Sequence, residues 1–164
     1  MEKSIQNLKA AFAGESQANR KYLAFAEKAD KECYHQVARL FRAAAEAETV
    51  HAMNHLKALK AIGSTADNLK EAITGETTEF REMYPPMIAA AQADGNKEAE
   101  RTFTFANEVE KTHAALFEKA LKTMDAQMLV DIFVCPVCGH TLVGEPPEKC
   151  PVCGAVKKLF KKID

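Results

Sequence analysis

The chain has 164 residues, of which 47% are hydrophobic and 27% are charged, and its formal net charge is −1. This composition is typical of a soluble globular protein, and the length suits one domain or one domain with a small appendage. No uncharged apolar segment approaches the roughly 18 residues that span a bilayer, and the N-terminus lacks the apolar core of a signal peptide. We therefore expect neither membrane insertion nor secretion, and the balanced charge offers no general attraction for nucleic acid.

The five cysteines are distributed unevenly. Cys33 stands alone and is expected to be a structural residue at a helix end. The other four form two Cys-x-x-Cys motifs near the C-terminus, at Cys135, Cys138, Cys150 and Cys153. In intracellular proteins, paired motifs of this kind bind metals more often than they form disulfides. The pattern therefore indicates a metal protein of the reducing cytoplasm.

Residues up to about 128 are rich in Ala, Glu, Lys and Leu, and apolar residues recur there at steps of three and four. The predicted helices span residues 4–30, 34–61, 67–93 and 97–124. Gly63 is expected to end the second helix, and the proline pair at residues 85–86 is expected to kink or interrupt the third. Ser64, Thr65 or Asp67 can cap the third helix.

Four amphipathic helices with short connections favour an all-α, antiparallel four-helix bundle over residues 1–128. After residue 128 the composition changes, because Val, Ile, Phe, Gly and Pro replace Ala and Glu. We expect residues 128–131 to lead into a small module of loops and strands at residues 129–164. A chain of roughly thirty-five residues buries too little apolar surface to fold alone, so a metal is expected to stabilise this module.

The helical region repeats itself at a spacing of about 61 residues. Glu15 ends the segment FAGE and is followed by Arg20, while Glu76 ends the related segment ITGE and is followed by Arg81. The motif Glu-x-x-His also occurs twice, at Glu48 and His51 and at Glu110 and His113. We therefore expect two related helical hairpins whose polar residues face each other across a pseudo-twofold axis.

Carboxylates occupy positions on the apolar stripes where a bundle normally presents Leu or Ile. These residues are Glu15, Glu48, Glu76, Glu79 and Glu110. An ionised carboxylate removed from water without a partner costs several kcal/mol, and Arg and Lys are too few on these stripes to compensate. In each Glu-x-x-His motif the two side chains lie one turn apart on one helix face, so both can bind the same metal. Two metal ions would neutralise the whole cluster, as in other di-metal carboxylate bundles.

A single Glu-x-x-His motif is commonly a solvated surface pair, and only its matched repetition predicts a di-metal site. Mixed carboxylate and imidazole ligands favour iron or manganese over zinc. Tyr22 and Tyr84 lie on the same stripes, where they either donate hydrogen bonds to ligand carboxylates or pack as ordinary aromatic residues. His55 is expected beside the ligands or in the core. No role is assigned to His35 or His140.

The two cysteine motifs are nearly identical, with the sequences CPVCGH at residues 135–140 and CPVCGA at residues 150–155. The glycine after each second cysteine frees the backbone to turn, so that amide groups can point at the sulfurs. Four thiolates at this spacing predict a tetrahedral site for zinc or a single iron, and two disulfides are the disfavoured alternative. A zinc ribbon and a rubredoxin use the same motif, so the thiolates alone do not select the metal.

Several segments together resemble the rubrerythrins, in which a ferritin-like di-iron bundle is joined to a rubredoxin-like Fe(Cys)4 domain. They are residues 13–18 (AGESQA), 48–51 (ETVH), 75–79 (GETTE), 82–85 (EMYP) and 110–113 (EKTH), with the two cysteine motifs. The resemblance covers essentially the whole chain. It implies a cytoplasmic, NADH-linked non-haem peroxidase that reduces hydrogen peroxide to water in defence against oxidative stress.

The resemblance also implies roles for individual residues. The di-iron ligands would be Glu15, Glu48, Glu79, Glu110 and His113, with Glu76 and His51 as alternative ligands to one iron. The four cysteines of the C-terminal motifs would hold a single electron-transfer iron, with zinc as the alternative metal. Electrons would come from a redox donor such as a rubredoxin or an NAD(P)H-dependent reductase. A homodimer, head-to-tail or larger, would bring one chain's module beside its partner's di-iron site.

Two other functions fit parts of the sequence. A ferritin-like ferroxidase would use the same carboxylates to oxidise Fe(II) for storage, but it needs no thiolate module to supply electrons. A non-enzymatic interaction protein would use a structural zinc ribbon and a basic tail formed by Lys157, Lys158, Lys161 and Lys162. A charge run of this kind is usually a solvated surface, so we favour the redox function.

Overall fold

The computed structural model describes residues 2–126 and 129–164, and the chain divides into two compact units, Met1–Gly63 and Ser64–Asp164. We call them the N-terminal unit and the C-terminal unit. Residue 128, where the helical region was expected to end, lies outside the described residues. Within the described part, no helix combines the length and the apolar character needed to cross a membrane.

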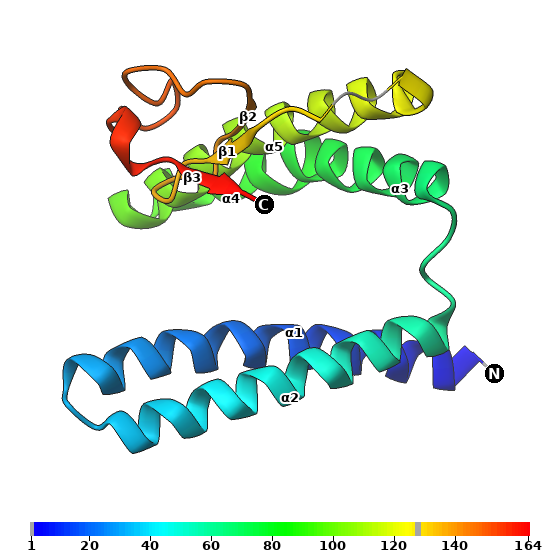
Figure 1. The fold of residues 1–164 in the computed structure, drawn as a ribbon, viewed down its shortest axis with the longest axis vertical. Helices are drawn as coiled ribbons and strands as arrows, with labels where there is room; N and C mark the ends of the chain where they lie inside the picture. The colour runs from blue at the N-terminus through cyan, green and yellow to red at the C-terminus, as the bar shows by residue number, and fades with distance from the viewer. Residues whose placement is uncertain (1, 127–128) are drawn as a thin grey trace. The chain divides into compact units, whose positions relative to one another are not determined.

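The N-terminal unit is a helical hairpin formed by α1 (Glu2–Lys31) and α2 (His35–Leu59), as Figure 1 shows. The side chains buried between the helices are all small: Ala26, Ala29, Ala38, Ala45 and Ala52. Asn19 adds a polar link, because its Nδ2 donates to the Ala45 carbonyl at 2.7 Å and to Thr49 Oγ1 at 2.9 Å. Alanine at these positions lets the two backbones approach closely, and it leaves the larger apolar side chains on the outside of the hairpin.

Two non-glycine residues in the left-handed region of backbone conformation mark the ends of α2. Cys33 has a φ of 65° and lies exposed in the turn before α2. It therefore stands at a helix end, as expected, but its side chain is not buried in the structure. After α2, Lys60 has a φ of 53°, and its N–H reaches the Leu56 and Lys57 carbonyls. The prediction that Gly63 ends this helix is therefore wrong, because the αL cap forms three residues earlier.

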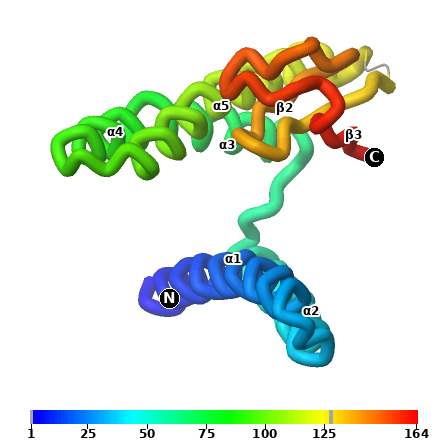
Figure 2. Tube along the Cα trace, turned by 90° about the vertical axis from the view of Figure 1, so that its left-hand side faces the viewer, coloured from blue at the N-terminus to red at the C-terminus, as the bar shows by residue number. Residues whose placement is uncertain are grey.

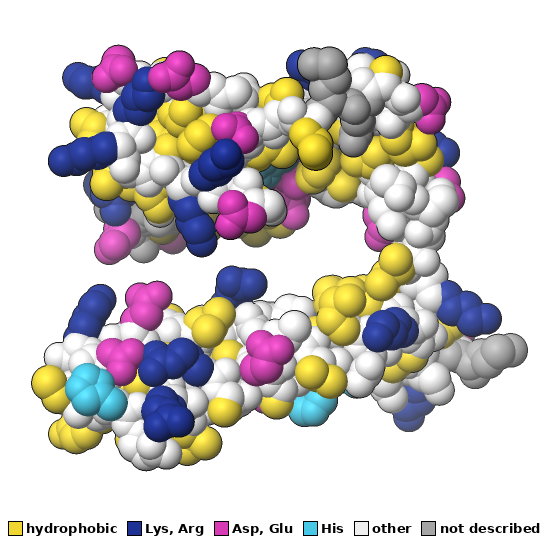
Figure 3. Space-filling view, viewed as in Figure 1, with side chains coloured by type: hydrophobic (Ala, Val, Ile, Leu, Met, Phe, Trp, Pro, Cys, Tyr) yellow, Lys and Arg dark blue, Asp and Glu magenta, His cyan; other side chains and the backbone are white. Residues whose placement is uncertain are grey.

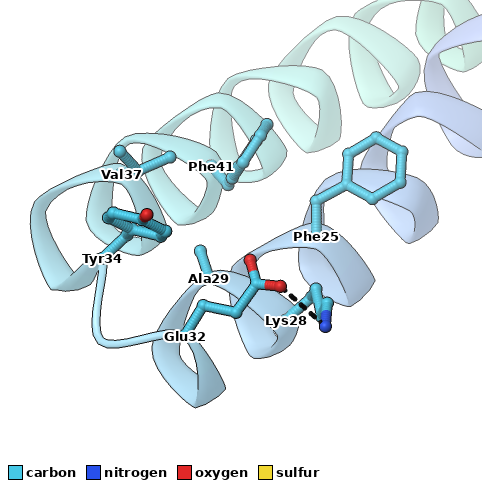
Figure 4. Close-up of a pocket in the computed structure, with 7 residues that line it drawn as sticks. All are labelled: Phe25, Lys28, Ala29, Glu32, Tyr34, Val37 and Phe41. Atoms are coloured by element: carbon cyan, nitrogen blue, oxygen red, sulfur yellow. Dashed lines mark ion pairs between the residues drawn. The ribbon is translucent and has the colours of Figure 1, made fainter.

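Aromatic side chains gather where the hairpin turns. Figure 4 shows Phe25, Tyr34, Val37 and Phe41 around an open cavity of about 450 Å³. Tyr22 belongs to this cluster, since its ring centroid lies 6.3 Å from that of Phe25 and 6.2 Å from that of Phe41. Of the two roles considered for Tyr22, the contacts in the structure are those of a packed aromatic residue.

The C-terminal unit contains α3 (Thr65–Thr78), a π-helical turn (Glu79–Met83), α4 (Tyr84–Ala93) and α5 (Lys97–Lys122). Ser64 caps α3, because its side chain accepts a hydrogen bond from the backbone N–H of Asp67. The proline pair follows the π turn and stands in the first turn of α4, so the predicted interruption takes the form of a change in helix type. A π turn inserts an extra residue per turn and commonly occurs at functional sites. Here it begins at Glu79.

The C-terminal module contains three short strands, β1 (Ile132–Val134), β2 (Thr141–Val143) and β3 (Lys161–Ile163). They form one antiparallel sheet in the order β2-β1-β3, with Phe133 opposite Leu142 and Lys162. The module lies against α5, as Figures 1 and 2 both show. Gly139 faces this helix, and a Cβ placed there would lie 3.8 Å from Cγ1 of Val109.

The N-cap of α5 can be tested by replacing Asn96. It is the N-cap of α5, and its side chain accepts a hydrogen bond from the Ala99 N–H at 3.1 Å. Replacing Asn96 with Ala should lower the free energy of unfolding by about 1 kcal/mol, as measured by urea denaturation. Asn96→Asp keeps the acceptor and is the matched control. Equal loss in both variants would show that the cap does not stabilise α5.

Candidate metal centres

The four cysteines of the C-terminal module converge on one point. The Sγ atoms of Cys135 and Cys153 are 3.6 Å apart, as are those of Cys138 and Cys150, and all four lie within 4.8 Å of one another. Sulfurs bound at about 2.3 Å to one tetrahedral metal would be separated by roughly 3.8 Å, whereas a disulfide requires about 2.05 Å. The spacing therefore fits a single tetrahedral metal, and all five cysteines of the chain are free of disulfides.

The backbone explains how two short loops bring the thiols together. In the first loop, Cys135 N–H donates to the His140 carbonyl, and Gly139 N–H donates to the Cys135 carbonyl, both at 2.9 Å. The second loop repeats the pattern around Cys150 and Gly154. The turn needs a positive φ after the second cysteine, and Gly139 and Gly154 supply φ values of 84° and 76°.

Electrostatics within the thiol cluster favour a bound cation. Burial alone would raise the pKa of Cys135, but the backbone N–H groups of Val137 and Cys138 hold it below its usual value. Burial raises the pKa of Cys138 and of Cys153 above the usual value of a thiol. Four thiolates this close therefore need a positive charge between them, which a metal ion supplies.

One cluster of potential ligands lies in the N-terminal unit and consists of Glu15, Glu48 and His51. One ligand atom of each lies within 4.8 Å of the others. His51 Nδ1 is 2.8 Å from Glu48 Oε2, one helical turn away on α2. The Glu48 side chain is 17% exposed and that of His51 is 55% exposed, so this cluster sits at the edge of the hairpin surface.

A matching cluster lies in the C-terminal unit and consists of Glu76, Glu110 and His113. His113 Nδ1 is 2.8 Å from Glu110 Oε2 and 3.7 Å from Glu76 Oε1. The predicted repeat is therefore visible in space, because each Glu-x-x-His pair has the same 2.8 Å contact through Nδ1. This cluster is better buried, with the Glu110 and His113 side chains 14% and 26% exposed.

Glu79 and Tyr84 lie around the second cluster without joining it. Burial raises the pKa of Glu76, and the neighbouring Glu110 carboxyl adds to that increase. Burial also raises the pKa of Glu79, with a further contribution from the charge of Glu76. Burial and then the charges of the three carboxylates raise the pKa of Tyr84. Tyr84 is therefore a phenol held close to the cluster, whereas the aromatic contacts of Tyr22 are with Phe25 and Phe41.

Two residues that the sequence did not single out also lie near the second cluster. Thr141 Oγ1 is 2.9 Å from His113 Nε2, across the contact between β2 and α5. His140 is next to it, with a buried Nδ1 that has no partner among the described groups. A cavity of about 710 Å³ opens beside Glu76 and His113, lined mainly by apolar side chains of α5 and the module. The sequence offered no signal for Thr141, since a single hydroxyl after a cysteine motif is unremarkable.

The donor atoms of both kinds of site fit iron. The thiol cluster supplies four soft sulfur ligands in a tetrahedral arrangement, which suits a rubredoxin-type iron as well as zinc. The two helical clusters supply carboxylate oxygens and one imidazole nitrogen each, which is the ligand chemistry of di-iron carboxylate proteins. Among the described residues, His55 belongs to neither cluster.

Comparison with known protein families matches two parts of the chain. A rubrerythrin family model matches residues 6–121, and a model of the rubredoxin-like domain of rubrerythrins matches residues 133–161. Rubrerythrin-2 of Clostridium acetobutylicum is 40% identical over 94% of this chain and 93% of its own length. Nigerythrin of Nitratidesulfovibrio vulgaris is 38% identical over 96% of this chain and 85% of its own length.

Solved structures of nigerythrin are similar to this chain. The fully reduced, all-ferrous nigerythrin matches with a TM-score of 0.61 and 36% sequence identity, covering 97% of this chain and 86% of that one. The partially reduced state also gives a TM-score of 0.61, with 37% identity. Together these matches confirm the predicted fold class, a ferritin-like helical bundle with a small rubredoxin-like module, and they confirm iron as the cofactor of both sites.

Metal analysis of the purified protein tests the ligand sets. We expect about three irons per chain, two held by the carboxylate clusters and one by the thiolates. The visible spectrum should show the red absorption of thiolate-bound ferric iron. A colourless protein that retains only zinc after anaerobic expression with added iron would contradict the electron-transfer role of the cysteine site.

Proposed function

The chain belongs to the rubrerythrin family, and from this we propose that it is a non-haem peroxidase that reduces hydrogen peroxide to water in defence against oxidative stress. The reaction consumes one peroxide, two electrons and two protons and yields two waters. The observation that carries the proposal is the contact between Thr141 and His113, which sets the cysteine module beside a carboxylate cluster within one unit. A module that holds a one-electron carrier next to a di-metal ligand set suits repeated delivery of electrons.

We propose that Glu15, Glu48, Glu79, Glu110 and His113 are the di-iron ligands, with Glu76 and His51 as alternative ligands to one iron. When bound, the iron pair supplies the two electrons that cleave the O–O bond, and the thiolate-held iron supplies one-electron transfer. The carboxylates neutralise the cations, and the imidazoles complete the ligand sets from the same helix faces. Tyr84 stays protonated because its pKa is raised, so its hydroxyl can donate a hydrogen bond toward the cluster.

Electrons would come from a redox donor such as a rubredoxin or an NAD(P)H-dependent reductase in the cytoplasm. We divide the chain into a di-iron bundle at residues 1–128 and a rubredoxin-like domain at residues 129–164. The module lies against α5 of its own unit, through the contact between Thr141 and His113.

We further propose that the chain assembles as a homodimer or a larger oligomer. Large apolar side chains lie on the surface of the N-terminal unit, and Figure 3 shows hydrophobic groups there among the charged ones. Leu40 is 68% exposed and Val50 is 52% exposed. Both lie on α2, whose buried residues are all alanine. A hairpin with so small a core gains stability when further apolar surface covers it.

The alternatives receive less support. A ferroxidase takes its electrons from incoming Fe(II), which leaves the cysteine module without a purpose. A basic interaction surface is weakened by ion pairs, because Lys157 contacts Glu145 and Glu148, and Lys162 contacts Asp131. Two of the four lysines of the proposed tail are therefore partly neutralised within their own module.

Replacing His113 with Ala should abolish steady-state peroxide reduction and leave the red thiolate-iron absorption, because the two ligand sets come from separate segments. Glu110→Ala should behave in the same way. His35→Ala is the matched control, since His35 is exposed on a helix of the same kind and its ring contacts Asp30, away from both carboxylate clusters. Peroxide turnover at the wild-type rate in His113→Ala would show that the ligand assignment on α5 is wrong.

A double replacement of Cys138 and Cys153 with Ser distinguishes the peroxidase from the ferroxidase. Steady-state peroxide reduction with a reductase as donor should disappear, while the reduced di-iron site should still react once with added peroxide. Stopped-flow mixing with peroxide and, separately, with oxygen measures this single reaction. Faster oxidation by oxygen than by peroxide, together with undiminished turnover of Fe(II), would favour iron handling instead.

A further inference from the structure

Both ring nitrogens of His113 have a polar neighbour. Nδ1 faces the carboxylates, at 2.8 Å from Glu110 Oε2 and 3.7 Å from Glu76 Oε1. Nε2 faces the C-terminal module, at 2.9 Å from Thr141 Oγ1. The ring is therefore held between its own helix cluster on one side and the first residue of β2 on the other.

The second hydrogen bond of the Thr141 hydroxyl determines whether Thr141 Oγ1 or His113 Nε2 is the donor in the contact between them. Thr141 Oγ1 is also 3.0 Å from the Gly139 carbonyl, which can only accept a hydrogen bond, so the hydroxyl hydrogen points there. The same oxygen then accepts from His113, and Nε2 keeps its hydrogen. Nδ1 is left to face Glu76 and Glu110, where it can bind a metal. A ligand histidine whose other nitrogen donates to a fixed acceptor is held in both tautomer and orientation.

The internal repeat provides a control within the same chain. His51 has the same Nδ1 contact with its Glu48 neighbour as His113 has with Glu110, and the distance is 2.8 Å in both. Among the described residues, no hydrogen-bond partner reaches Nε2 of His51, and its side chain is 55% exposed against 26% for His113. The two related histidines therefore differ in their exposure and in the acceptor that the module supplies at Nε2 of His113.

The position of Thr141 depends on the cysteine loop. The backbone N–H of His140 donates to the Cys138 sulfur, and the His140 carbonyl accepts from Cys135 N–H at 2.9 Å. Thr141 follows directly and starts β2, where it pairs with Val134 of β1. The loop that surrounds the thiolate site is therefore the loop that places the Thr141 hydroxyl.

We propose that Thr141 is a positioning residue, through which the folded cysteine module fixes the His113 ring as a metal ligand of the neighbouring carboxylate cluster. This inference rests on the proposed function, because it takes His113 to be a ligand. It adds that the two metal sites of one chain are structurally coupled: the ligand geometry on α5 depends on a hydroxyl that belongs to the other site's module.

The test uses the full chain loaded with Zn²⁺, a diamagnetic probe that accepts carboxylate, imidazole and thiolate ligands. Zinc affinity at the carboxylate clusters is measured by competition with a chelator. Thr141→Val, which keeps the shape and removes the hydroxyl, should weaken it about 10- to 100-fold and leave the thiolate site unchanged. Thr141→Ser should restore the wild-type affinity. Thr104→Val is the matched control, since the Thr104 hydroxyl donates to the Glu100 carbonyl of its own helix.

A second measurement does not depend on the affinity of a variant. In NMR spectra of the zinc-loaded wild type, the Nε2–H hydrogen of His113 should be visible and should exchange slowly with water. It should persist in Thr141→Ser and disappear in Thr141→Val. Equal zinc affinity in wild type and Thr141→Val, or a His113 ring whose hydrogen sits on Nδ1, would overturn the inference alone. A wild type that binds zinc only at the cysteines would overturn the proposed function as well.

Discussion

Negative charge held away from water is the constraint on which the rest of this structure depends. Carboxylates occupy partly buried positions on the helices, and four thiols converge within one small loop cluster. Burial raises the pKa of Glu76 and Glu79 and of two of the cysteines, which is the direction expected for acids that lack a counter-charge. Bound cations resolve this cost, so the fold and the cofactor cannot be separated.

The helices are arranged to present these groups rather than to bury a large core. Alanines form the contact between α1 and α2, and a π turn at Glu79–Met83 shifts the register of the third helical segment beside Glu76. The alanine contact leaves large apolar side chains such as Leu40 at the surface of the N-terminal unit. Metal binding and assembly would therefore supply stability that the hairpin interior does not.

The cysteine module has two structural roles that share one piece of backbone. Its first loop needs a positive φ at Gly139 to direct amides at sulfur, and the same turn brings the module's surface against Val109 of α5. Thr141 follows within two residues and reaches His113. The loop that surrounds the thiols thus ends in a contact with His113 of the carboxylate cluster.

The sequence by itself determined the features that depend on local pattern. Helix periodicity located all four helical stretches. The two cysteine motifs predicted the thiolate site, because the short spacing of the ligands along each loop leaves them little freedom. The matched Glu-x-x-His motifs likewise predicted equivalent contacts at His51 and His113, and the structure shows both at 2.8 Å.

Only the tertiary structure decided what depends on contacts between distant segments. The packing of Tyr22 with Phe25 and Phe41, and of Tyr84 near the carboxylates, separated two tyrosines that the sequence treated alike. Thr141 carries no sequence signal, because a hydroxyl acquires a role only when the fold brings an imidazole within 2.9 Å. Periodicity records which face a residue occupies, and it does not record what packs against that face.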